Sequence, residues 1–143
     1  MRAFHCDRFV LPLPPGHTFP VAKYAILRER LLAERVLLPD DLAEPEAAGN
    51  AELERVHDAT YVRRVVEGQL SAEEVRAIGL PWSPELVERS RRSVGGTLAA
   101  CRWALVEGVA VNLAGGTHHA DRDRGAGYCV FIDPQPANVR IAS

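Results

Sequence analysis

The sequence is poor in cysteine, and its cysteines form no recognisable pattern. Only three occur among 143 residues, Cys6, Cys101 and Cys129. An odd number without any Cys-x-x-Cys spacing indicates neither a disulfide framework nor a zinc site made of thiolates. The thiols therefore give no reason to expect an oxidising compartment.

Long apolar runs and an excess of one charge are also missing. No stretch approaches the roughly 20 apolar residues of a membrane-spanning helix, and residues 1–7 lack the apolar segment of a signal peptide. The 17 basic and 19 acidic side chains give a formal charge of −2, without the clustered positive charge that nucleic acid or an anionic membrane requires. We expect a cytoplasmic protein that binds neither nucleic acid nor a membrane.

Lysine is nearly absent as well, since Lys23 is the only one. This bias toward arginine is typical of a GC-rich bacterial gene.

Apolar residues are plentiful enough for one α/β domain, at 47% of the chain. A short strand is expected near residues 3–6. A helix is expected over about residues 20–37, with an apolar stripe formed by Tyr24, Leu27, Leu31 and Leu38. The small and polar residues 43–50 predict a loop, which is the place where an insertion would be tolerated best.

Two short helices carry clear start and stop signals. Asp58 can cap a helix that Gly68 closes. Ser71 and Glu74 form a capping box for a second helix, which stops by Gly79.

The longest predicted helix begins at Ser83 and Pro84, a cap followed by a first-turn proline. Its apolar residues recur at helical spacing: Val87, Val94, Leu98, Cys101 and Leu105. Gly95 and Gly96 each cost about 1 kcal/mol there, so either another backbone approaches closely or the helix simply tolerates them. Residues 109–114 then predict a buried, interior parallel strand, which completes the helix-then-strand order of an α/β sheet.

A pair of histidines stands where this apolar strand stops. The motif reads Gly115-Gly116-Thr117-His118-His119, continues through Asp121 and Asp123-Arg124, and ends in Gly127-Tyr128-Cys129. Ligands bind at the carboxyl ends of strands in open α/β sheets. Imidazole, whose ordinary pKa is about 6.5, can accept and return a proton near neutral pH. This segment is therefore the predicted site.

The motif resembles the strand-end signature of the histone deacetylase superfamily of zinc-dependent amidohydrolases, Gly-Gly-x-His-His-Ala followed by Gly-Phe/Tyr-Cys and Phe-Asn-Asp. The resemblance extends upstream through residues 4–20, 57–61 and 84–96, and the Asp123-Arg124-Gly125 loop is similar to class IV and its bacterial relatives. It implies an open parallel-sheet α/β fold of the arginase/deacetylase type, of which this chain would be an incomplete, N-terminal portion.

The resemblance implies roles for four residues. His118 would stabilise charge, and His119 would act as general base on a zinc-bound water and then as acid. Gly127 would face the substrate through its backbone, and Tyr128 would line the acyl-lysine channel, although an ordinary core aromatic is an equal alternative for it. The remaining histidines are expected outside catalysis: His17 in a solvated loop, and His5 and His57 in structural positions.

Several parts of the family's site have no counterpart in the sequence. These are the later zinc ligands, an Asp-x-His and a further Asp, and the catalytic tyrosine. Phe131-Ile132-Asp133 replaces Phe-Asn-Asp, and two prolines follow where the family begins a helix. We therefore expect residues 1–131 to be the N-terminal part of a deacetylase domain and residues 132–143 to be a divergent tail, frameshifted or truncated. The complete enzyme would use zinc to hydrolyse acetylated lysine or another N-acetyl amide, whereas this chain alone would bind no zinc and be inactive.

Two alternatives stay open. The chain can be a non-enzymatic remnant or an interaction module that keeps part of the fold. It can also be a self-contained metallohydrolase using His118, His119, Asp121 and Asp123, although Asp123-Arg124 is expected to be a local ion pair of small value. If the chain is a fragment or a remnant of a deacetylase, the strand over residues 109–114 lacks a neighbour on one side. This exposed sheet edge predicts self-association.

Overall fold

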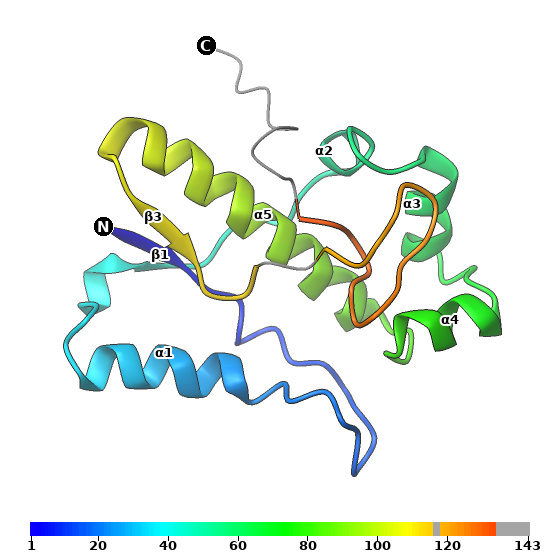
Figure 1. The fold of residues 1–143 in the computed structure, drawn as a ribbon, viewed down its shortest axis with the longest axis horizontal. Coiled ribbons are helices and arrows are strands. Elements are labelled where there is room, and N and C mark those ends of the chain that lie inside the picture. The colour runs from blue at the N-terminus through cyan, green and yellow to red at the C-terminus, as the bar shows by residue number, and fades with distance from the viewer. Residues whose placement is uncertain (116–117, 134–143) are drawn as a thin grey trace.

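The chain folds around a small parallel β-sheet (Figure 1). The computed structural model describes residues 1–115 and 118–133. Its three strands are β1 (Arg2–Phe4), β2 (Leu42–Ala43) and β3 (Ala110–Asn112), in the order β2-β1-β3. Both pairings of β1 are parallel. The predicted α/β class with a parallel sheet is confirmed.

Helices connect and cover the strands. They are α1 (Lys23–Ala33), α2 (Asn50–Leu53), α3 (Ala59–Val66), α4 (Ala72–Ile78) and α5 (Pro84–Glu107), with a 3-10 turn at Pro39–Asp41. Helix α5 packs along β1 and β3, and α3 and α4 gather near its N-terminal end together with residues 118–133 (Figure 1). Within the described part of the chain, no helix is long and apolar enough to cross a membrane.

The predicted cap signals are confirmed at α3 and α4. The Asp58 carboxylate accepts a hydrogen bond from the Thr60 amide at 2.8 Å. At α4, the Ser71 hydroxyl accepts from the Glu74 amide while the Glu74 carboxylate accepts from the Ser71 amide. Gly79 ends this helix in a left-handed conformation, with φ of 78°, which favours glycine.

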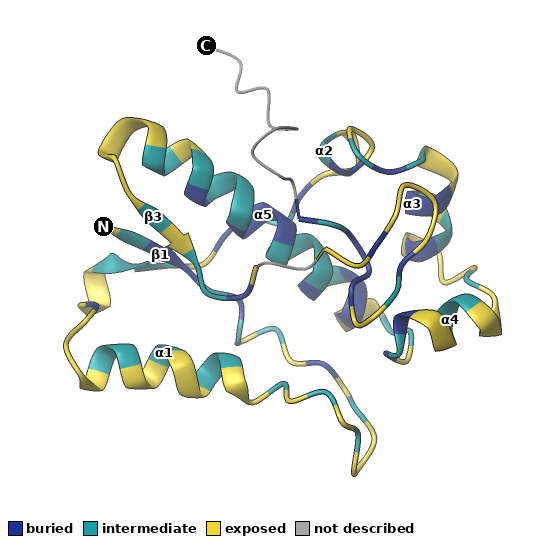
Figure 2. Ribbon diagram, viewed as in Figure 1, coloured by how far each residue is buried: buried dark blue, intermediate teal, exposed yellow. Residues whose placement is uncertain are grey.

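The hydrophobic core lies where α3, α4 and α5 meet residues 130–131, as the dark patches of Figure 2 indicate. Tyr61, Val62 and Val65 of α3 are almost completely buried there. The Tyr61 hydroxyl donates to the Val130 carbonyl at 2.7 Å, so the ring both fills the core and satisfies its polar end. This core anchors Val130 and Phe131, which directly follow the predicted site residues in the chain.

Helix α1 is shorter and more exposed than its apolar spacing predicts. None of its residues is buried, and Figure 2 shows it largely in the colours of partial and full exposure. Arg35 adopts φ of 55°, and the Val36 amide reaches back to the Leu31 carbonyl at 2.9 Å. This left-handed ending stops the helix before residue 37, so Leu37 is buried outside it.

The predicted close approach at Gly95 is confirmed. A Cβ at this position would lie 1.9 Å from the Glu46 carbonyl oxygen. The Arg92 guanidinium of the same helix donates to the Pro45 carbonyl at 2.7 Å, and Pro45 is buried. Residues 44–49 form the predicted loop between β2 and α2, and α5 holds it through hydrogen bonds from Arg91 and Arg92. Its tolerance to insertion stays a prediction, which these hydrogen bonds make less favourable.

Strand β3 is parallel, as predicted, but it is not buried on both faces. Val109 is 53% exposed and Val111 is 39% exposed. Among the described residues β3 pairs only with β1, so it forms an edge of the sheet rather than its interior. Its polar residue, Asn112, turns toward α5 and donates to the Ser93 carbonyl at 2.8 Å.

Candidate functional site

Residues 118–133 follow the carboxyl end of β3 and lie beside α3 and α4 (Figure 1). Three backbone hydrogen bonds fix this segment. The Asp58 amide donates to the Arg122 carbonyl at 2.8 Å, the Gly127 amide to Ala77 at 3.0 Å, and the Tyr128 amide to Ile78 at 2.7 Å. The last two use carbonyls at the end of α4, which lack helical partners. The helix end thus positions the Gly127-Tyr128 pair.

Gly127 and Tyr128 are the central residues of a tight turn. Ala126 and Cys129 exchange backbone hydrogen bonds at 3.0 and 2.8 Å on either side of it. Both central residues have positive φ, 55° for Gly127 and 65° for Tyr128, as a type I′ turn requires. Glycine adopts this conformation freely, whereas for tyrosine it is uncommon and costly. The surroundings must therefore hold Tyr128 in place.

The ring of Tyr128 is held by the loop that precedes α1. Its hydroxyl shares a hydrogen bond of 2.9 Å with the Thr18 hydroxyl, and its ring centroid lies 5.1 Å from that of Phe19. Tyr128 is 38% exposed, so it is not the core aromatic that the sequence left open. Sequence reasoning missed Thr18, which lies 110 residues away in the chain.

His17 anchors the same loop instead of being solvated. Its Nδ1 accepts from the Phe19 amide at 3.1 Å, which leaves the proton on Nε2. Nε2 then donates to the Gly79 carbonyl at 3.0 Å. The expectation of a solvated loop residue is wrong, because His17 ties the Thr18 loop to the end of α4.

The two histidines of the motif lie next to this turn. His118 and His119 are both exposed, and their rings stack with centroids 4.5 Å apart. The His119 ring packs against the Gly127 backbone, where a Cβ would come within 3.2 Å of its Cγ. The fold therefore brings His118, His119, Gly127 and Tyr128 together, while Gly116 and Thr117 of the motif lie outside the described residues.

Among the described residues, Asp121 pairs with an arginine. Arg124 donates through Nε and Nη2 to the Asp121 carboxylate at 2.8 and 2.6 Å. The Asp121 amide also donates to the Arg124 carbonyl at 2.8 Å, and this turn places residues 121 and 124 side by side. The expected Asp123-Arg124 pair is thus wrong, and Asp121 takes the place of Asp123.

This arrangement also bears on metal binding. A catalytic zinc site uses three protein ligands. Across the part of the chain that the structure describes, no group of three or more His, Cys, Asp or Glu side chains could hold a metal ion. His118, His119, Asp121 and Asp123 therefore do not fit the self-contained metal site that the sequence left open.

His57 fastens the other side of the segment, in the structural position that the sequence predicts. The ring is buried, its Nε2 accepts from the Ile132 amide at 3.0 Å, and its Nδ1 donates to the Arg122 carbonyl at 3.3 Å. Burial lowers the pKa of His57 below its ordinary value, because an apolar environment disfavours the charged imidazolium.

Tyr128 also lines a small cavity of about 40 Å³. Phe19, Tyr24 and Arg89 are among its lining residues. The Arg89 guanidinium is buried and donates to the Cys6 and Phe9 carbonyls at 2.8 and 2.9 Å. Nothing in the helical spacing of α5 distinguishes this arginine from its partly buried neighbours Arg91 and Arg92, so sequence reasoning missed it.

Comparison with known proteins shows which family this sequence belongs to. Residues 17–137 match the histone deacetylase domain. The chain belongs to the histone deacetylase family. An uncharacterized protein of Picosynechococcus is 41% identical over 130 residues, which are 91% of this chain and 43% of that protein. Histone deacetylase 2 of Arabidopsis thaliana is 29% identical over 82% of this chain and 32% of its own length. This family member therefore spans less than half the length of these relatives.

The deacetylase fold is confirmed by solved structures. An HDAC homolog from Aquifex aeolicus aligns with a TM-score of 0.74 at 22% identity, over 96% of this chain and 39% of that one. An HDAC homolog complexed with SAHA also aligns with a TM-score of 0.74, at 23% identity. Because both identities are below 25%, the structural similarity establishes the fold and nothing further.

Proposed function

We propose that this chain carries part of the active site of a zinc-dependent deacetylase that hydrolyses N-acetyl amides, with acetylated lysine as the leading substrate class. The observation that carries the proposal is the contact between the His119 ring and the Gly127 backbone, beside Tyr128, in a histone deacetylase family member. Because the chain spans less than half of its relatives, the proposed activity is that of a complete enzyme to which further segments contribute.

His119 is the proposed general base. It would take a proton from the water that attacks the acyl carbonyl and return it to the departing amine, a task that suits imidazole near neutral pH. The ring is exposed next to the turn, so a substrate can reach it. His118, stacked 4.5 Å away, is proposed to stabilise the charge that develops on the carbonyl oxygen.

Gly127 and Tyr128 are the proposed substrate-binding residues. Gly127 offers backbone without a side chain, so an acyl chain can approach it closely. Tyr128 offers a partly exposed ring that Thr18 and Phe19 hold in one position. A fixed apolar wall of this kind suits the methylene chain of an acylated lysine.

Zinc is the proposed cofactor of the complete enzyme. The described residues of this chain do not form a site with three protein ligands, so the ligands would come from other segments. For that reason we expect the 143-residue chain on its own to have no deacetylase activity.

A chimera tests this proposal. Residues 1–131 would be joined to the downstream part of the Picosynechococcus relative, which is 41% identical over the shared region. We expect the chimera to hydrolyse an acetyl-lysine reporter in a chelator-sensitive reaction, and the 143-residue chain to give no turnover. A folded but inactive chimera, beside an intact Picosynechococcus protein that is active in the same assay, would instead support the non-enzymatic remnant. Chelator-sensitive turnover by the chain alone would contradict the assignment of the missing ligands.

A further inference from the structure

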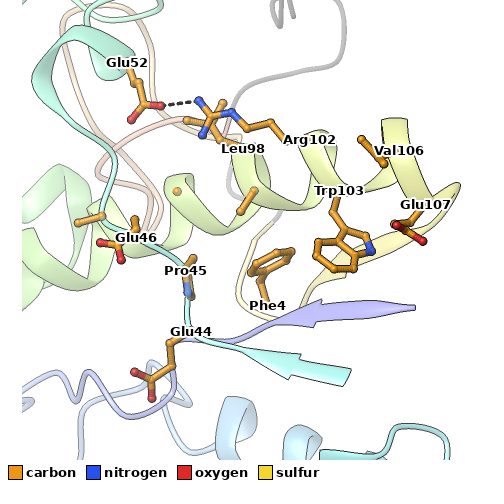
Figure 3. Close-up of a pocket in the computed structure, with 13 residues that line it drawn as sticks. Phe4, Glu44, Pro45, Glu46, Glu52, Leu98, Arg102, Trp103, Val106 and Glu107 are labelled. Carbon is orange, nitrogen blue, oxygen red and sulfur yellow. Dashed lines mark hydrogen bonds and ion pairs between the residues drawn. The ribbon is translucent and has the colours of Figure 1, made fainter. Parts of the chain in front are cut away.

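A larger pocket opens between α5 and the segment that follows β2, away from the candidate site (Figure 3). Its volume is about 520 Å³, within the range of about 300–1,000 Å³ that small-molecule sites occupy. None of its lining residues belongs to the histidine motif or to the Gly127-Tyr128 turn. Its ligand is therefore a separate question from the deacetylase reaction.

The floor of this pocket is apolar and aromatic. Phe4 of β1 and Trp103 of α5 lie next to each other over the sheet, with Val106 further along the helix (Figure 3). The Arg2 guanidinium lies 4.5 Å from the centroid of the Trp103 ring, which helps to hold the indole in place. Val106 remains 82% exposed, so the described residues leave apolar surface for an aryl or alkyl group to cover.

The rim of the pocket carries an excess of carboxylates, those of Glu44, Glu46, Glu52 and Glu107. Glu52 is neutralised by Arg102 at 2.8 Å, and Glu44 is paired with Arg8 at 3.1 Å. Glu46 and Glu107 take part in no ion pair within the described chain. Arg2, which lies over Trp103, is in none of these ion pairs either and offsets one of the two charges, so one net negative charge remains beside the aromatic floor.

We propose that this pocket binds a small organic cation, an ammonium group on an aryl or alkyl body. The body would cover the Phe4-Trp103-Val106 floor, and the ammonium would lie toward Glu46 or Glu107. A carboxylate of the same size would meet the net negative charge of the rim, which disfavours it, and a neutral molecule would gain only the apolar contact. The combination of floor and rim thus selects a cation.

Three ligands with similar bodies and different charges test the proposal. The 143-residue chain would be titrated with phenethylammonium, 2-phenylethanol and 3-phenylpropionate. Trp103 is one of only two tryptophans, so indole fluorescence reports on the floor, and titration calorimetry gives a measure that does not depend on tryptophan. We expect saturable binding, with the ammonium about 5-fold tighter than the alcohol, as for one exposed ion pair, and the carboxylate weakest. Added salt at about 1 M should remove most of this preference.

Charge-removing variants locate the cation. Glu46→Gln and Glu107→Gln keep the size of exposed side chains, and we expect at least one of them to weaken phenethylammonium about 5-fold while leaving 2-phenylethanol unchanged. Glu54→Gln is the matched control, because Glu54 is exposed but does not line the pocket. Equal affinities for alcohol and ammonium, an ammonium affinity that neither variant lowers, or no saturable binding by any ligand would overturn the proposal. None of these results bears on the deacetylase chimera.

Discussion

At the scale of single residues, the hydrogen bonds of the buried His57 imidazole require the ring to be neutral. Its Nε2 is an acceptor for the Ile132 amide, and a protonated ring has no acceptor to offer. The unfolded chain binds this proton near the ordinary pKa of 6.5, whereas burial lowers the pKa in the folded chain. Between these two pKa values the unfolded state binds more protons, so the free energy of unfolding rises with pH.

We therefore predict that the contribution of His57 to stability is complete above about pH 6.5 and is lost as the pH falls toward its lower, folded-state pKa. Urea unfolding of the wild type at a series of pH values measures this. His57→Phe keeps an aromatic ring between Tyr61 and Phe131 but cannot titrate. The variant should be less stable at pH 7, because the Ile132 amide loses its acceptor, and its stability should vary less with pH in this window. An identical pH dependence in both proteins would count against His57 as the titrating group.

His119 and Tyr128 should differ sharply in the chimeric enzyme described above. His119→Ala removes the proposed general base, and we predict a loss of about 10²–10⁴-fold in kcat/KM. Tyr128→Phe removes one exposed hydrogen bond to Thr18 and keeps the ring contact with Phe19, so the loss should stay below about 10-fold. Steady-state rates on an acetyl-lysine reporter decide the point. Near-wild-type rates for both variants would remove His119 from the mechanism.

At the scale of secondary-structure elements, the two glycines of α5 offer a graded test of packing. Gly95→Ala would place a methyl group 1.9 Å from the Glu46 carbonyl oxygen, and backbone held by Arg92 cannot move aside cheaply. We predict destabilisation of about 1–3 kcal/mol, even though alanine favours the helix by about 1 kcal/mol. Thermal or urea unfolding gives the value.

Gly96→Ala is the matched comparison in the same helix. Its new methyl group would meet the Asn112 side chain, at 2.8 Å from the amide nitrogen. A side chain can rotate away more easily than backbone, although Asn112 would lose its bond to Ser93. We expect Gly96→Ala to cost less than Gly95→Ala, and the reverse order would show that residues 45–48 yield more readily than their hydrogen bonds suggest.

The same elements explain which features the sequence predicts. Helix starts at Asp58 and Ser71 depend on contacts within three residues, so local patterns find them. The segment after β2 depends on Arg92, 47 residues away, and its polar composition hides this role. In the same way, the resemblance singles out His119 and Gly127, which the structure brings into contact, whereas the Thr18 contact that holds Tyr128 has no local signal. The Asp121-Arg124 pair was missed because a turn decides it, and adjacency in sequence favoured Asp123 instead.

At the scale of the whole molecule, the 143-residue chain should hold no stoichiometric zinc. A catalytic zinc needs three protein ligands, and the described residues bring together no such group. Elemental analysis after dialysis against trace zinc measures the metal content, and the chimera, for which we propose bound zinc, is measured in parallel. One tightly held zinc per chain would show that the ligands differ from those that the family resemblance implies.

The sheet edge at β3 predicts how the chain behaves in solution. Among the described residues β3 has a partner on only one side, and Val109 and Val111 are partly exposed there. An apolar strand with an open edge offers unpaired backbone groups to another copy, which proteins normally prevent with charge or cover. We therefore predict that the 143-residue chain forms oligomers or aggregates, as light scattering would show. Val111→Lys should increase the monomer fraction, whereas Val66→Lys, which adds the same charge on α3 far from this edge (Figure 1), should have a smaller effect. If the wild-type chain is instead a monomer that unfolds in one sharp cooperative transition, β3 needs no further strand, and these residues form a complete domain by themselves.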